Sequence, residues 1–245
     1  MNKLWMSASL LLVTAALTAQ KADSVAQAQR QQEYLANYKR ALLYDDMPSA
    51  AYALTGYLQN GGQDSYKDSL AIIYYRSGNL NGSYRLANES YTADNKNVTA
   101  LTLLADITGR AGDNKASLDW YEKLSALAPS PYNYYQLATR QFILERVGEC
   151  RQTLQKVVAD SVKAKEEQVT LEIGQGQGEN VPILAAAYNM LGALAYRDKK
   201  EAEAKAMYQK AIEAFPDFVI ARQNLESLKK PAAPAAKAPA KGPKG

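Results

Sequence analysis

The sequence contains no histidine in 245 residues and only one cysteine, Cys150. Histidine is the most common general base and metal ligand in proteins, and most serine and cysteine triads depend on it. A lone thiol makes neither an internal disulfide nor a zinc site. We therefore expect no enzyme activity, no catalytic or metal-binding residues and no cofactor, and we predict that Cys150 is a buried structural thiol.

Long apolar runs are also missing, except at the N-terminus. There a basic start ending at Lys3 precedes a mostly apolar segment from Leu4 to Ala19. This order is typical of a secretory signal peptide, and the segment is short for a membrane span. We predict a signal peptide over residues 1–19, with an uncut anchor as the alternative. The mature protein is then expected to be exported, periplasmic or envelope-associated, and not membrane-spanning.

The formal net charge of +4 does not indicate a basic surface. Lys3 lies in the N-terminal segment and five lysines lie in residues 229–245, which leaves 23 of the 29 basic residues against 25 acidic ones. Because this body is near neutral, we expect no nucleic-acid partner. Residues 231–245, rich in Pro, Ala and Lys, have no apolar pattern and are predicted to form a disordered tail.

A pattern of small, aliphatic and aromatic residues returns five times at a spacing of about 33 to 34 residues, long enough for two short helices and a turn. The clearest copy is carried by Tyr188, Leu191, Gly192, Ala204, Tyr208, Ala211 and Pro216. Its first three residues share one helix face, its small residues let two helices approach, and its proline ends the second helix. In other copies, Gly78-Asn79 and Gly112-Asp113 supply a helix stop followed by a cap.

This spacing resembles the repeating unit of the tetratricopeptide repeat (TPR) family, in an exported, Bacteroidetes-like bacterial type. The copies in this register cover residues 31–63, 64–97, 98–131, 131–164 and 185–218. The resemblance implies an all-α fold, a right-handed α-solenoid of about five TPR-like helix pairs within residues 20–230. An apolar helical pattern follows the last copy, and we predict a capping helix over residues 219–230 that covers the last pair.

The register breaks at an insertion over residues 165–184. Val169, Leu171 and Ile173 alternate with polar residues, a period of two that suits a strand, and several glycines follow. The insertion is therefore either a small β-hairpin or a mobile loop. It lacks the Lys-Ser/Thr pair of a phosphate-binding loop. Because insertions in repeat arrays often lie on a binding face, it is also a candidate binding segment.

In TPR proteins the first helices of the pairs line a groove, so the resemblance implies which side chains meet a partner. Arginines recur at position 13 of three copies, counted from the first residue of each range, and aromatic residues flank them. The predicted partner-binding residues are Arg76, Arg110, Arg197, Tyr75, Tyr132, Tyr135, Phe142, Asn189 and Tyr196. Such side chains suit a peptide with acidic groups. The alternative is that the arginines are solvated and the tyrosines pack against neighbouring helices.

The predicted function is a scaffold for protein–protein interaction or complex assembly in the bacterial cell envelope. The lysine and asparagine set with which chaperone-binding TPR domains hold a carboxylate is missing, so a chaperone tail is not an expected partner. The alternatives are an envelope-polymer (peptidoglycan) binding module that uses the basic tail, and a non-catalytic subunit of an envelope enzyme complex. Asp-Ser-aliphatic triplets at residues 23–25, 68–70 and 160–162 are similar to the O-glycosylation sequon of Bacteroidetes envelope proteins, and the sequence leaves their modification open.

Overall fold

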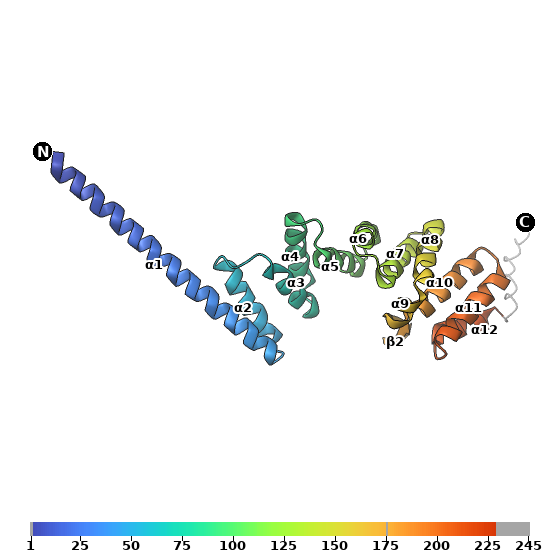
Figure 1. Ribbon diagram of the computed structural model, residues 1–245. Helices are drawn as coiled ribbons and strands as arrows, with labels where there is room; N and C mark the ends of the chain where they lie inside the picture. Colours follow the sequence, from blue (N-terminus) through green and yellow to red (C-terminus); the bar gives the residue numbers. More distant parts are fainter. Residues whose placement is uncertain (1, 175, 229–245) are drawn as a thin grey trace, which may run out of the picture. The chain divides into compact units, whose positions relative to one another are not determined.

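The computed structural model describes residues 2–174 and 176–228, with side chains from residue 23 onward. Two compact units divide the chain, residues 1–127 and residues 128–245. The predicted tail over residues 231–245, and the last two residues predicted for the capping helix, lie outside the described residues. In the described part, 12 helices and one two-stranded sheet are present (Figure 1).

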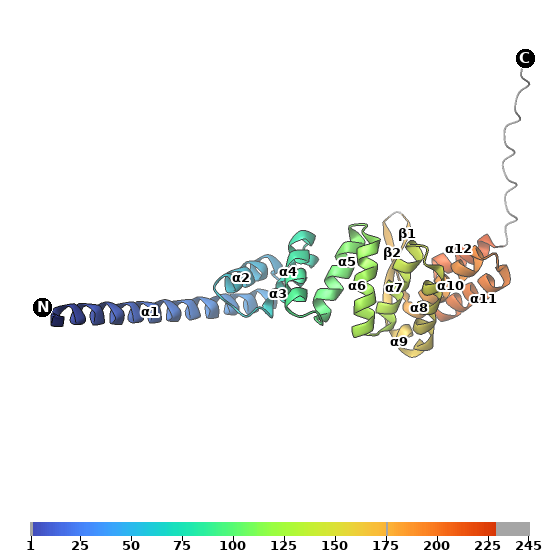
Figure 2. The ribbon, with the colours of Figure 1, turned by 90° about the horizontal axis from the view of Figure 1, so that it is seen from above.

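The first unit consists of three helix pairs, α1/α2, α3/α4 and α5/α6, whose members lie side by side (Figures 1 and 2). Their bounds are α1 (Asn2–Leu43), α2 (Met47–Gln59), α3 (Tyr66–Arg76), α4 (Leu80–Ala93), α5 (Val98–Arg110) and α6 (Asn114–Leu127). Helix α1 runs without a break through the segment predicted as a signal peptide. Among the described helices, none combines the length and apolarity that a membrane crossing requires.

The second unit holds two further pairs, α7/α8 and α10/α11, with the insertion between them. The bounds are α7 (Pro131–Ile143), α8 (Val147–Ala159), α9 (Ser161–Glu166), β1 (Gln168–Gly174), β2 (Gln177–Pro182), α10 (Ile183–Arg197), α11 (Glu201–Ala214) and α12 (Val219–Ser227). Strands β1 and β2 pair antiparallel, with Val169 opposite Val181. The insertion is therefore a short helix and a β-hairpin rather than a mobile loop. Helix α12 packs against α11 and α10, as predicted for a capping helix.

The five pairs share one turn geometry. At position 15 of every copy the backbone has a positive φ, and the residues are Asp45 (53°), Gly78 (82°), Gly112 (82°), Glu145 (60°) and Lys199 (60°). The next residue donates its backbone N–H to the carbonyl of position 11 in each case, for example Asn79 to Tyr74 at 2.8 Å and Lys200 to Ala195 at 2.9 Å. This contact ends the first helix with a left-handed residue. Even the copy at residues 31–63, the poorest match in sequence, keeps this turn.

The positive φ at position 15 predicts opposite effects for two substitutions. Lys199→Gly removes a side chain from a conformation that only glycine adopts freely, and we expect a gain of about 0.5–1 kcal/mol in the free energy of unfolding. Gly112→Ala should lose a similar amount, because nothing lies within 4 Å of an added Cβ and only the backbone conformation opposes it. Urea denaturation followed by circular dichroism measures both. Equal midpoints for Gly112→Ala and the wild type would contradict the explanation.

The core of each unit is built from the residues that define the repeat. Leu104, Tyr121 and Tyr208 are buried, as the pattern predicts. At position 20, Ser117 donates its hydroxyl to the carbonyl of Ala105 at 2.7 Å, and Cys150 donates its thiol to the carbonyl of Ala138 at 3.3 Å. These bonds join the two helices of a pair where they are closest. The expectation of an all-α solenoid of repeated helix pairs, with a hairpin and a capping helix, is confirmed.

Candidate functional site

The first helices of the second and third pairs bring Tyr75, Asp106 and Arg110 together. The Tyr75 hydroxyl donates a hydrogen bond to the Asp106 carboxylate. Arg110 donates from Nε to Asp106 Oδ2 at 3.0 Å, and its guanidinium carbon lies 4.7 Å from the centre of the Tyr75 ring. We call these three residues the Tyr75 cluster. It contains two of the predicted partner-binding residues and one acidic residue that the sequence did not single out.

The Tyr75 cluster fixes Arg110 without using all of its donors. Only Nε of Arg110 contacts the carboxylate within hydrogen-bonding distance, and the side chain remains largely exposed. The two terminal nitrogens therefore stay available for a ligand. Arg76, the last residue of α3, is also exposed and makes no ion pair with any residue that the structure describes. The first unit thus presents two guanidinium groups to solvent, one at the end of α3 and one at the end of α5.

In the second unit the predicted residues are divided between the surface and internal contacts. Tyr196 is 54% exposed and Tyr132 is 37% exposed. Arg197 is exposed and lies 3.6 Å from the carboxylate of Glu145, the left-handed residue of the α7/α8 turn. Phe142 is partly buried against the core cluster of this unit. Only Tyr196, Arg197 and Tyr132 therefore offer exposed side chains to a partner.

Tyr135 and Asn189 make contacts inside the protein. Tyr135 is only 5% exposed, so its side chain is part of the core and not of the exposed surface that was predicted to meet a partner. The reason is the insertion: α9 packs against α7, and Ala164 of α9 belongs to the same buried cluster as Tyr135. Burial raises the pKa of Tyr135, which keeps the phenol neutral. Asn189 accepts a hydrogen bond from Asn224 of α12 at 2.9 Å, so the capping helix uses the group that was expected to bind a partner.

Two carboxylates of the insertion accept hydrogen bonds from the first turns of neighbouring helices. Glu167 accepts a hydrogen bond at 2.7 Å from the backbone N–H of Tyr132, in the first turn of α7. Glu179 of β2 accepts one at 3.3 Å from the backbone N–H of Val219, where α12 begins. Each of these two backbone N–H groups at a helix start is therefore paired. A negative charge at this end also interacts favourably with the helix dipole. Val181 is fully buried, so one side of the hairpin is part of the core.

Cys150 is a structural thiol, as predicted. Its side chain is fully buried, and burial raises the pKa of the thiol to about 11 from an ordinary value of 9.0. Among the described residues, no group of three or more Cys, Asp or Glu side chains is arranged to hold a metal ion. Of the Asp-Ser-aliphatic triplets, the one ending in Leu70 has its aliphatic residue buried, while Val25 and Val162 are exposed.

The raised pKa predicts slow alkylation of Cys150 in the folded protein. At pH 8, below both pKa values, the thiolate fraction is about a hundredfold lower than at an ordinary thiol, before steric protection is counted. We expect little reaction with iodoacetamide in native buffer, rapid reaction in urea, and a native rate that rises with pH up to about 11. Mass spectrometry of timed samples measures these rates. A native rate equal to that in urea would show that the thiol is accessible.

The helix pairs, their shared turns and the capping helix define a TPR fold. No protein-family model matches the sequence. No curated protein sequence matches it either.

Solved structures do match. A TPR protein from Parabacteroides merdae is 16% identical, with a TM-score of 0.63, over 82% of this chain and 72% of that chain. MamA from Desulfovibrio magneticus RS-1, residues 41 to the end, is 16% identical, with a TM-score of 0.61, over 78% and 97%. YrrB, described as a TPR protein with an unusual peptide-binding site, is 12% identical, with a TM-score of 0.63, over 79% and 90%. At these identities the likeness establishes the fold alone.

Proposed function

We propose that this protein is an exported TPR scaffold that binds an acidic segment of another protein in the bacterial cell envelope. The observation that carries this proposal is the Tyr75 cluster. It presents a guanidinium to solvent in a fixed orientation, on the helices with which TPR proteins bind peptides. The peptide-binding site for which YrrB is described is consistent with the same use of this fold.

The chemistry of the cluster favours a carboxylate ligand. An arginine side chain loses conformational freedom when it binds a ligand, and Asp106 and the Tyr75 ring already restrict Arg110. The planar guanidinium matches a carboxylate through paired hydrogen bonds, which an ammonium group does not. Arg76 supplies a second positive charge from the adjacent position of α3, so a segment with more than one acidic side chain is preferred.

The second unit contributes a separate patch in this proposal. Tyr196 and Arg197 end α10 with an aromatic ring and a guanidinium next to each other in sequence, as Tyr75 and Arg76 end α3. The ion pair between Arg197 and Glu145 is exposed, so it is weak and can be exchanged for a ligand carboxylate. The same Tyr-Arg dipeptide therefore ends a first helix in each unit, and each unit has its own arginine for a partner carboxylate.

Affinity capture from envelope extract tests the role of the arginines. Full-length wild-type protein is compared with Arg76→Ala, Arg110→Ala and Arg197→Ala, and with Arg85→Ala, an exposed arginine of the second helix α4, as the matched control. We expect the three test variants, but not the control, to recover less of a shared partner. Arg110→Lys keeps the charge and loses the planar fork, so it should also recover less. Equal recovery by all variants would reject the site.

Export is tested separately. The apolar segment that follows Lys3 supports it, and cleavage after Ala19 would leave Gln20 as the first residue. Fractionation of the source cells and mass spectrometry of the N-terminal peptide measure both. Recovery of the intact N-terminus in the cytoplasmic fraction would reject the envelope assignment and leave the partner-binding proposal standing.

A further inference from the structure

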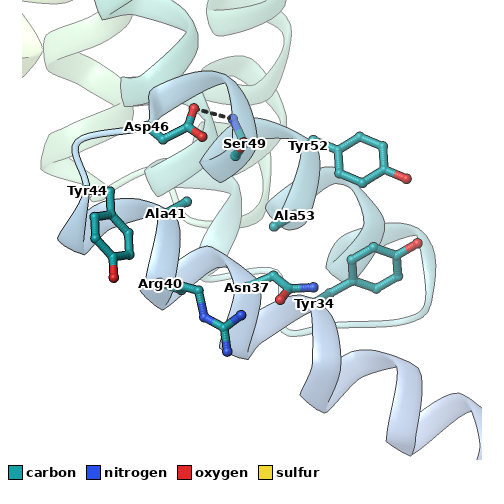
Figure 3. A pocket seen from close by; sticks show the side chains of 9 residues that line it. All are labelled: Tyr34, Asn37, Arg40, Ala41, Tyr44, Asp46, Ser49, Tyr52 and Ala53. Carbon is teal, nitrogen blue, oxygen red and sulfur yellow. Dashed lines mark hydrogen bonds between the residues drawn. The ribbon is translucent and has the colours of Figure 1, made fainter.

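A pocket of about 430 Å³ lies between α1 and α2, away from the Tyr75 cluster. Its lining comes only from α1, the following turn and α2. Ala41 and Ala53 are buried and form part of its lining. Figure 3 shows Tyr44 on one side of the pocket, Tyr34 and Tyr52 on the other, and Arg40 and Asn37 between them.

The pocket lies on the face with which later pairs pack against a preceding helix. At position 11 of the second copy, the hydroxyl of Tyr74 lies 3.4 Å from that of Thr55 in α2. At position 23 of the third copy, the Trp120 ring stands edge-on to Tyr91 of α4, with 4.9 Å between centres. The first copy has Ala41 and Ala53 at these two positions. Small residues therefore stand where the second copy has Tyr74 and the third copy has Trp120, each of which contacts a preceding helix.

The rim of the pocket exposes aromatic surface. Tyr44 is 79% exposed and Tyr52 is 74% exposed, and the Tyr34 ring lies edge-on to Tyr52 with 6.4 Å between centres. Leu43, next to Tyr44, is exposed as well. Apolar and aromatic side chains gathered around a hollow are typical of an interaction site rather than of an ordinary solvated surface.

The charges of the pocket select an acidic ligand. Hydrogen bonds from the side chain of Ser49 and from its backbone N–H, the latter at 3.1 Å, lower the pKa of the Asp46 carboxyl. Its charge is therefore engaged at the start of α2. Arg40 also lines the pocket, is exposed, and makes no hydrogen bond or ion pair within the described residues. Of the two charged side chains that line the pocket, Arg40 is therefore the one free to pair with a ligand.

We propose that this pocket binds one amphipathic helix of a partner protein. The helix inserts a large apolar side chain over Ala41 and Ala53, between Tyr44 and Tyr52, and places a Glu or Asp against Arg40. A helix is the occupant because the corresponding face of the second and third pairs contacts the helices α2 and α4. The apolar anchors of such a ligand recur three, four and seven residues apart. The site does not depend on the Tyr75 cluster or on the function proposed for it.

The probe is a displayed library of random peptides of roughly 16 residues, about four helical turns, selected on the immobilised full-length protein. We expect enriched sequences with apolar residues at helical spacing and an acidic residue on the same side. An enriched peptide, labelled with a fluorophore, is then titrated with purified variants. Tyr52→Ala and Arg40→Glu should each weaken binding at least about tenfold, the effect expected of a residue that anchors an interface.

Charge reversal makes the test specific. A peptide in which the acidic residue is replaced by Lys should bind Arg40→Glu better than the wild type. Tyr84→Ala and Arg85→Glu, both at exposed positions of α4, are the matched controls and should bind as the wild type does. Circular dichroism checks the fold of every variant, and Arg40 and Tyr52 are exposed, so their replacement leaves the core intact.

Three results would overturn the proposal. The first is a selection that enriches no peptide, or only peptides without helical spacing of apolar residues. The second is binding that Tyr52→Ala and Arg40→Glu do not change. The third is self-association in analytical ultracentrifugation that Tyr52→Ala abolishes, because the occupant would then be a second copy of this chain. Failure of the arginine variants in the capture experiment above would leave this proposal unaffected.

Discussion

Replacement of Phe218 by alanine is expected to reduce the free energy of unfolding of the second unit by about 3–5 kcal/mol. The side chain is fully buried, in the same cluster as Ile183 and Ala211. Its carbonyl accepts the backbone N–H of Arg222 at 3.2 Å in the first turn of α12. The residue therefore fixes the capping helix through its ring and its backbone, and the alanine variant loses the ring and leaves a cavity.

The neighbouring Phe215 provides the matched control. Its ring lies 6.3 Å from that of Phe218, but it is only partly buried. We expect Phe215→Ala to cost clearly less than Phe218→Ala, because burial and not the presence of a ring determines the loss. Urea denaturation followed by circular dichroism compares the two. A smaller effect of Phe218→Ala than of Phe215→Ala would show that α12 is held in another way.

Replacement of Gly192 by alanine is expected to cost about 2–3 kcal/mol, because an added Cβ would overpack the core. That Cβ would lie 2.5 Å from Cε1 and 2.6 Å from Cδ1 of Tyr208, closer than such atoms approach. The Tyr208 ring is only 3% exposed, so it has no space into which to move. The loss should appear as a lower urea midpoint.

Two comparisons test this cause. Gly56→Ala places a Cβ against the Tyr34 ring, but Tyr34 is partly exposed and can turn toward the pocket. We expect a smaller loss there. In the Tyr208→Leu background, Gly192→Ala should cost much less than it does alone, since the ring that it meets is gone. Additive losses in the double variant would show that the ring is not the obstacle.

The helix pairs were predictable from the sequence because their determinants are local and repeated. Gly192 and Tyr208 belong to one copy of the pattern, sixteen residues apart, and Ala105 and Tyr121 have the same two positions in the copy at residues 98–131. The hairpin was predicted as one of two alternatives, because the alternation of Val169 and Leu171 shows a strand but not its pairing. The buried side of that hairpin, with Val181, is visible only in the structure.

The candidate sites were less predictable because they depend on contacts between copies. Asp106 reaches Tyr75 across 31 positions of sequence, and only its ion pair with Arg110, four residues further along α5, has a local sequence signal. Tyr135 has a register position typical of a binding residue, yet it lies in the same buried cluster as Ala164 of α9. The pocket between α1 and α2 had one available signal. The first copy has alanine at position 11, where the second copy has Tyr74, and at position 23, where the third copy has Trp120.

The insertion shows how this architecture accepts new chain. Helix α10 still packs directly on α8, as α5 packs on α4, although α9 and the hairpin intervene in sequence. Each pair packs mainly on its immediate neighbours. Extra residues can therefore be inserted between two pairs without moving the helices that pack together there. The links between pairs are therefore places where such a protein can gain a new surface while the rest of its framework is inherited unchanged.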